Sequence, residues 1–175
     1  DEKEIEMLNE LFDGEELKPE VKETIEKIAN TFVQELNDDG IKFTLKDIVL
    51  LGSNVSYNYT KDSDLDIHLI ADSSNLECPD NLYPLLYSAY RSIFNKNYDI
   101  KIRDIPAEIY VEMDEPQAKS NGMYSLNNGW LKHPEQTAIP ELDREAFEKL
   151  FKEWEDKYFD LIERVNEELS DDIYD

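Results

Sequence analysis

The chain has 175 residues, of which 40% are hydrophobic; this is enough for one domain with a buried core and excludes a disordered chain. Its 42 acidic and 18 basic residues give a formal net charge of −24, and such a field repels phosphate backbones. We therefore expect no non-specific DNA binding. A small acceptor, a protein, or an RNA end held by a local basic patch stays open as a partner.

The cysteine count and the hydropathy of the chain bear on the cell compartment in which the protein is expected. Cys78 is the only cysteine, which excludes an internal disulfide and a metal site built from cysteines. The sequence has no apolar stretch long enough to span a membrane, and we expect no signal peptide. We therefore expect a cytoplasmic protein without membrane partners.

The first fifty residues predict two helices and a strand. Residues 1–17 carry apolar residues at roughly helical spacing, which predicts an N-terminal helical extension that ends near Gly14. A second helix is expected over Lys18–Leu36, because Pro19 favours a first helical turn and a long apolar stripe follows it. Ile41–Leu51 contains the first strand, clearest at its apolar end.

A turn and an acidic strand follow within Leu50–Ile70. Gly52 and Ser53 break the first strand, and a short helix at Asn54–Tyr57 would present free N–H groups that suit a phosphate. In the next strand apolar residues alternate with Asp64, Asp66 and His68, so the two aspartates are expected on one face. Side by side they repel each other and raise each other's pKa unless a cation such as Mg²⁺ lies between them.

The second half predicts a helix, two hairpins and a long helix. After a loop over 71–81, a helix is expected over Leu82–Lys96 with Leu85, Leu86, Ala89, Tyr90, Ile93 and Phe94 facing inward. Hairpins are expected over 98–113 and 123–131, the second with the turn sequence Asn-Asn-Gly. An acidic, aromatic-rich helix is expected over Pro140–Tyr174. This order of elements predicts an α+β fold.

Further polar residues are candidates for the site. In the expected strand Ala107–Met113, Glu108 and Glu112 share one face and could add a third carboxylate. Asp62 and Ser63 precede the acidic strand, and Lys61 and Asp62 could contact a ligand from this loop, although solvated loop positions are favoured over that use. A polar, partly basic group in the second hairpin could bind phosphate or stack a base, or could simply cap the core: Lys119, Ser120, Lys132 and His133.

The turn and the acidic strand together resemble a known pattern. Gly52-Ser53, ten intervening residues, and then Asp64-Leu65-Asp66 within Ser-Asp-Leu-Asp are similar to the motif of the DNA polymerase β-like nucleotidyltransferase superfamily, especially its minimal single-domain members. The motif covers about twenty residues, and a looser likeness runs from Lys18 to His133. Many minimal members carry Gly four residues after the Ser, where this chain has Tyr57.

The resemblance implies a fold, a reaction and a set of ligands. It implies a mixed β-sheet of the nucleotidyltransferase type packed by helices. It also implies transfer of a nucleoside monophosphate, with AMP favoured, from a nucleoside triphosphate to an acceptor hydroxyl with release of pyrophosphate. It implies that Asp64, Asp66 and Glu108 are catalytic and hold Mg²⁺, or Mn²⁺ in its place. It also implies that Gly52, Ser53, Lys61 and Ser63 contact the nucleotide. Glu112 is the competitor of Glu108.

Two further readings compete with this one. The chain could be an inactive module that senses nucleotide or binds a protein, or an antitoxin-type enzyme that adds AMP to a protein. A cyclic-dinucleotide synthase is less favoured, because such enzymes carry a large helical second domain. The predicted organisation is a helical extension at 1–17, a nucleotidyltransferase domain at 18–133, and a helix at 134–175 packed on the domain.

Overall fold

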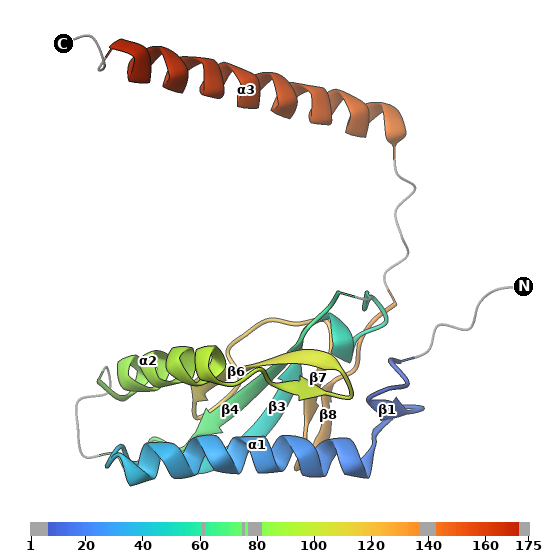
Figure 1. Cartoon of the computed structure of the whole chain (residues 1–175). Coiled ribbons are helices and arrows are strands. Elements are labelled where there is room, and N and C mark those ends of the chain that lie inside the picture. Colours follow the sequence, from blue (N-terminus) through green and yellow to red (C-terminus); the bar gives the residue numbers. More distant parts are fainter. Residues whose placement is uncertain (1–6, 61, 75, 77–81, 137–142, 172–175) are drawn as a thin grey trace, which may run out of the picture. The chain divides into compact units, whose positions relative to one another are not determined.

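The computed structural model describes residues 7–60, 62–74, 76, 82–136 and 143–171. The chain divides into two compact units, Asp1–Gln136 and Thr137–Asp175. In chain order the elements are β1 Phe12–Asp13, β2 Glu16–Leu17, α1 Pro19–Asp38, β3 Leu45–Leu51, the 3₁₀ helix η1 Ser53–Val55, β4 Leu65–Ala71, α2 Leu82–Asn97, β5 Lys101–Ile102, β6 Ile105–Met113, β7 Met123–Ser125, β8 Gly129–Lys132 and α3 Arg144–Asp171 (Figure 1).

The first unit is built on a six-stranded mixed sheet with the order β5-β6-β4-β3-β7-β8. Only the β4–β6 pair is parallel among these neighbours, and α2 lies between the two strands in the sequence. A parallel pair needs such a crossover, whereas the antiparallel neighbours β7 and β8 are joined by a short turn. The predicted α+β fold with a mixed sheet and a long C-terminal helix is confirmed.

Helices α1 and α2 pack together against one face of the sheet. The rings of Phe32 on α1 and Phe94 on α2 meet edge to face at 5.2 Å. Both belong to the core that contains Leu65 and Ile67 of β4 and Ile109 of β6. Because side chains alternate along a strand, Asp66 and His68 point to the opposite face. That face has a smaller apolar cluster around Val49, Leu51 and Ile70.

The helix predicted at the N-terminus is not found over residues 7–17, and residues 1–6 lie outside the described residues. Residues 12–17 form the two-stranded hairpin β1–β2 rather than the end of a helix, with Gly14 at a φ of 59° in its turn. Leu11, Phe12 and Leu17 are buried in the core of the first unit. The segment therefore belongs to the sheet unit, because tertiary burial of these side chains outweighs their helical spacing.

The inward face of α2 is also partly mispredicted. Phe94 is buried as expected, but Leu85 and Ile93 are 67% and 55% exposed. Tyr87 is buried instead, and its hydroxyl donates a hydrogen bond to the carbonyl oxygen of Lys42 at 2.6 Å. A buried tyrosine with a partner for its hydroxyl satisfies both parts of that side chain.

The second unit contains α3, which carries a row of exposed apolar side chains, including Phe147, Phe151, Trp154 and Tyr158. Its helical prediction is confirmed over the described residues, while the expected ends at 140–142 and 172–174 lie outside them. Packing of this helix on the first unit stays a prediction. No helix in the described parts of the chain is long and apolar enough to cross a membrane.

Candidate functional site

The parallel pair β4–β6 places two predicted carboxylates side by side. Asp66 lies directly opposite Glu108 in the register of the two strands. Neighbouring strands are about 4.8 Å apart, and both side chains point to the face away from the helices. Asp64 directly precedes β4, which begins at Leu65, and it is exposed. The site residues Asp64, Asp66 and Glu108 therefore gather at one end of this strand pair.

The electrostatics of Asp66 show that the three carboxylates act on one another. Burial, followed by the charges of Asp64 and Glu108, raises the pKa of Asp66 to about 6. None of the three carboxylates forms an ion pair with a described basic residue. Among the described residues, negative charge is thus concentrated here without an ion-paired cation. Repulsion between these carboxylates destabilises the folded chain, and a bound cation would relieve it.

Gly52 lies against Asp66 because β3 ends beside β4. Leu51 pairs with Asp66, and a Cβ atom placed on Gly52 would lie 2.8 Å from Oδ2 of Asp66. The backbone of Gly52 has a φ of 89° and a ψ of −173°, a region almost restricted to glycine. The first strand thus ends at Gly52, as the sequence predicts, and this glycine lies against the acidic site itself.

The turn after Gly52 is held by hydrogen bonds that the sequence analysis missed. Asn54 is buried, and its Nδ2 donates to the carbonyl oxygens of Ser63 and Asp64 at 3.0 and 2.7 Å. These bonds fix the start of β4 to η1 Ser53–Val55, and so fix Asp64 beside the turn. Asn54 directly follows Gly-Ser in the sequence, but its burial and its two acceptors come from the fold and give no local sequence signal.

Other predicted nucleotide contacts have mainly structural partners. Ser63 Oγ accepts a hydrogen bond from the N–H of Thr60 at 3.0 Å, which shapes the loop. Ser120 Oγ accepts the N–H of Gly52 at 3.2 Å, so the second hairpin region does reach the turn. Lys132 Nζ donates to the carbonyl oxygen of Ser120 at 2.7 Å. Lys61 lies outside the described residues.

Glu112 has a different environment from Glu108, although both project from the same face of β6. Its Oε1 atom is 2.5 Å from Nδ1 of His68, and its Oε2 atom accepts the N–H of Gln117. Burial lowers the pKa of His68, while the charge and hydrogen bond of Glu112 oppose that shift. Glu112 is therefore committed to His68 and Gln117, four residues away from the Asp66–Glu108 pair.

Tyr110 connects the two carboxylates of β6. Its hydroxyl donates to Oε2 of Glu108 at 2.9 Å, and its ring stacks on His68 with centroids 4.9 Å apart. Burial, with the hydrogen bond and charge of Glu108, raises the pKa of Tyr110 to about 12. The phenol is thus a permanent donor that orients Glu108.

The carboxylate oxygens of Asp64, Asp66 and Glu108 are ligands of the kind that Mg²⁺ prefers. Within the described residues, no three His, Cys, Asp or Glu side chains are already arranged as a metal-binding group. Mg²⁺, however, is usually held by one or two carboxylates together with phosphate oxygens of a substrate. The hard oxygen donors and unneutralised charge of Asp64, Asp66 and Glu108 fit an ion that arrives with a nucleotide.

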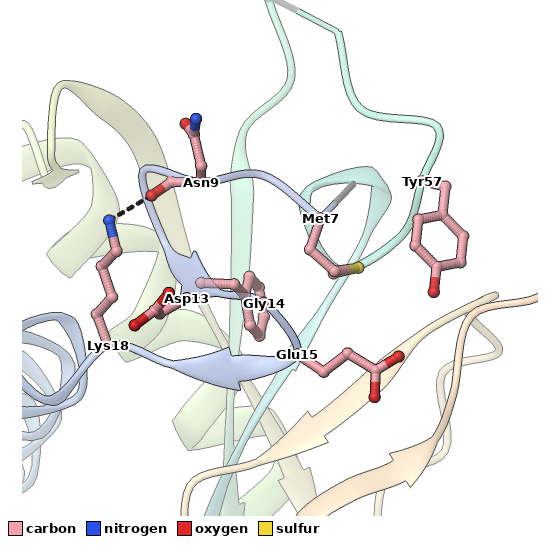
Figure 2. A pocket seen from close by; sticks show the side chains of 8 residues that line it. Met7, Asn9, Asp13, Gly14, Glu15, Lys18 and Tyr57 are labelled. Carbon is pink, nitrogen blue, oxygen red and sulfur yellow. Dashed lines mark hydrogen bonds between the residues drawn. The ribbon is translucent and has the colours of Figure 1, made fainter. Parts of the chain in front are cut away.

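A cavity lies on the first unit, away from the three carboxylates. It has a volume of about 470 Å³ and lies between the β1–β2 hairpin and Tyr57, with Met7, Phe12 and Glu15 among its lining residues (Figure 2). Tyr57, which follows the turn of Gly52 and Ser53, forms part of that wall. None of the three site carboxylates lines this cavity.

Comparisons with family models, with curated proteins and with solved structures find no match to this chain. The functional interpretation therefore depends on the motif and on the geometry described above.

Proposed function

We propose that this protein is a Mg²⁺-dependent nucleotidyltransferase that moves AMP from ATP to an acceptor hydroxyl and releases pyrophosphate. The observation that carries the proposal is the register of Asp66 with Glu108 beside Gly52. Asp64 joins them through its charge on Asp66. Gly-Ser and Asp-x-Asp each occur often by chance when taken alone. It is much less expected by chance that both lie in one site together with a third carboxylate.

Each residue has a role in the proposed reaction. Asp64 and Asp66 would hold the ion that accompanies the triphosphate, and Asp66 and Glu108 would hold a second near the acceptor. When bound, such ions neutralise phosphate charge and lower the pKa of the acceptor hydroxyl. The chain itself supplies placement: Asn54 fixes Asp64, Tyr110 orients Glu108, and Gly52 leaves room beside Asp66.

The direct test is transfer of label from α-labelled ATP by the Asp64→Asn, Asp66→Asn double variant. We expect the native chain to transfer label with Mg²⁺ and the variant to lose transfer while retaining its circular dichroism spectrum. Equal transfer by the folded double variant would refute the assignment.

A non-enzymatic module that binds nucleotide is the second candidate. It is favoured by one observation, the lack of a ready-made metal-binding group in the described part of the chain. Binding of Mg²⁺ and ATP without transfer to any of a panel of hydroxyl, protein and RNA acceptors would support this candidate. A mass gain of AMP on a copurified protein would instead identify a protein acceptor.

A further inference from the structure

We propose that the groove beside Glu108 takes an acceptor that carries a phosphate group near its hydroxyl, with Arg91 and Lys96 of α2 binding this phosphate. The inference rests on the proposed function, and it assigns the acceptor a chemical class. It concerns the side of the carboxylates that faces α2 and β5, where the sequence motif places no residue.

The groove shares two carboxylates with the proposed active site. It has a volume of about 310 Å³ and is lined by Asp64 and Glu108 together with the C-terminal end of α2 and the β5–β6 hairpin. Lys96 is on its wall. A molecule in this groove would therefore contact the same carboxylates that are proposed to activate the acceptor hydroxyl.

Two cations of α2 have no ion-pair partner in the described part of the chain, although the sequence has 42 acidic residues for 18 basic ones. Within the described residues, neither Arg91 nor Lys96 makes an ion pair or donates a hydrogen bond, whereas Lys101 and Arg103 nearby pair with Asp99 and Glu20 at 2.8 Å each. Lys96 thus stands unpaired on the groove wall, and Arg91 stands unpaired against the ring of Tyr110.

Arg91 is held close to the acidic site by an aromatic ring. Its guanidinium carbon lies 4.8 Å from the centroid of the Tyr110 ring, and the hydroxyl of that tyrosine donates to Glu108. Stacking on a ring leaves the N–H groups of a guanidinium available for an anion, and the planar fork of arginine matches phosphate oxygens. Arg91 is thus oriented without being neutralised.

Asp99 does not cancel these charges. It lines the groove with Lys96, but its Oδ2 atom accepts a hydrogen bond from Lys101 Nζ at 2.8 Å. Since Asp64 and Glu108 are proposed to hold metal ions, Lys96 keeps its positive charge for a bound molecule.

The sheet order indicates which substrate carries this phosphate. Gly52 and Ser53 follow β3, whereas Arg91 contacts β6, and β4 lies between these two strands. The two positions are separated by about two strand spacings, or ~10 Å. A triphosphate beside the Gly-Ser turn and an anion beside Arg91 are therefore on opposite sides of Asp66, so the second anion belongs to the acceptor.

The test uses the full chain with Mg²⁺ and without nucleotide, and glycerol 3-phosphate as the probe, with glycerol and inorganic phosphate beside it. We expect ¹⁵N NMR shifts at Arg91, Lys96 and Tyr110 with both phosphate probes and not with glycerol. The Arg91→Met, Lys96→Met variant should weaken binding about tenfold, because charge-assisted hydrogen bonds to phosphate are lost. Lys27→Met, which removes one positive charge from an exposed ion pair on α1, should leave binding unchanged.

Two results would overturn the inference. One is a set of phosphate-induced shifts at Gly52 and Ser53 but not at Arg91. The other is equal weakening by the Lys27 variant. Because this experiment needs no turnover, it stands even if ATP transfer fails. Conversely, an active enzyme that labels glycerol as well as glycerol 3-phosphate would refute the phosphate-bearing acceptor and leave the nucleotidyltransferase proposal intact.

Discussion

The two ends of the β4–β6 strand pair present their carboxylates in opposite ways. At one end Glu108 faces Asp66, and burial and like charges raise the pKa of that aspartate to about 6. At the other end Glu112 meets His68 at 2.5 Å, and the pair is nearly buried. The same face of β6 thus carries Glu108, which has no ion pair among the described residues, and Glu112, which is hydrogen-bonded to His68 and Gln117.

This difference shows how a functional carboxylate is distinguished from a structural one. Sequence position does not separate Glu108 from Glu112, because both alternate with apolar residues on one strand. Their neighbours do separate them: His68 and Gln117 complete the hydrogen bonding of Glu112, whereas Glu108 has the hydroxyl of Tyr110 and two other carboxylates. The unsatisfied end is therefore the candidate site.

The largest expected effect is on catalysis. Glu108→Gln should reduce label transfer from α-labelled ATP by about 10³-fold or more, since it removes charge that holds an ion at the reacting phosphate. Glu112→Gln should retain transfer to within about tenfold, because it lies outside the proposed reacting centre. Equal losses of label transfer in both variants would contradict the claim that Glu108, and not Glu112, belongs to the reacting centre.

The next effect concerns the turn at the acidic end. Gly52→Ala should lower the free energy of unfolding by about 2–4 kcal/mol, because the backbone region suits glycine and the new methyl group would meet Asp66 Oδ2 at 2.8 Å. Gly14→Ala is the matched control: its φ is also positive, at 59°, but its Cβ would meet nothing within 4 Å. Urea unfolding should show a smaller loss for Gly14. Equal losses would mean that contact with Asp66 contributes nothing.

The hydrogen-bonded end of the strand pair, at Glu112 and His68, should contribute more to the free energy of unfolding than the end at Glu108 and Asp66. Glu112→Leu leaves His68 and the N–H of Gln117 without their acceptor, and should cost about 1–3 kcal/mol. Glu108→Leu removes a like charge beside Asp66, and should change the free energy of unfolding by less than about 1 kcal/mol. A greater loss from Glu108→Leu, measured in the same urea series, would contradict this account.

The smallest effect is a pH dependence with a defined sign. The pKa of Asp66 is higher in the folded chain, at about 6, than its unfolded value near 3.8, so the folded state binds the proton more tightly. Its contribution is therefore most favourable below pH 3.8 and is lost as pH rises through 6. Asp66→Asn should stabilise the chain at pH 7.5 by about 1 kcal/mol, a value reduced for solvent screening of a half-buried group.

The advantage of Asp66→Asn should shrink when stability is measured near pH 4, where Asp66 itself approaches the neutral form. Paired urea titrations of the native and variant chains at the two pH values measure this directly. A constant difference between them would show that Asp66 is not subject to the repulsion inferred from the structure.

The sequence predicts much of the sheet because alternation and turn residues are local signals. The faces of Ala107–Met113, the hairpin at Asn127–Gly129 and the helix over 82–96 were expected, and the structure confirms them. Phe12 shows why other parts fail: it is buried against Tyr124 and Trp130, more than a hundred residues later, and no local pattern contains such a contact.

The site divides in the same way. Asp66 beside Gly52 follows from a short segment of sequence, and so could be predicted. The distinction between Glu108 and Glu112 could not, because it depends on the parallel register with β4 and on His68. Likewise, Asn54 and Arg91 gain significance only from the carbonyl oxygens and the ring that they contact.

The most direct test of the central claim is Mn²⁺ binding, followed by electron paramagnetic resonance, in the presence of non-hydrolysable ATP. We predict that the native chain and Glu112→Gln bind the ion with the nucleotide, whereas Asp66→Asn and Glu108→Gln lose at least about 90% of that binding at the same concentrations, equivalent to tenfold in affinity. Equal binding by all four chains, with each shown to be folded, would contradict the claim that Asp66 and Glu108 hold a nucleotide-bound metal ion.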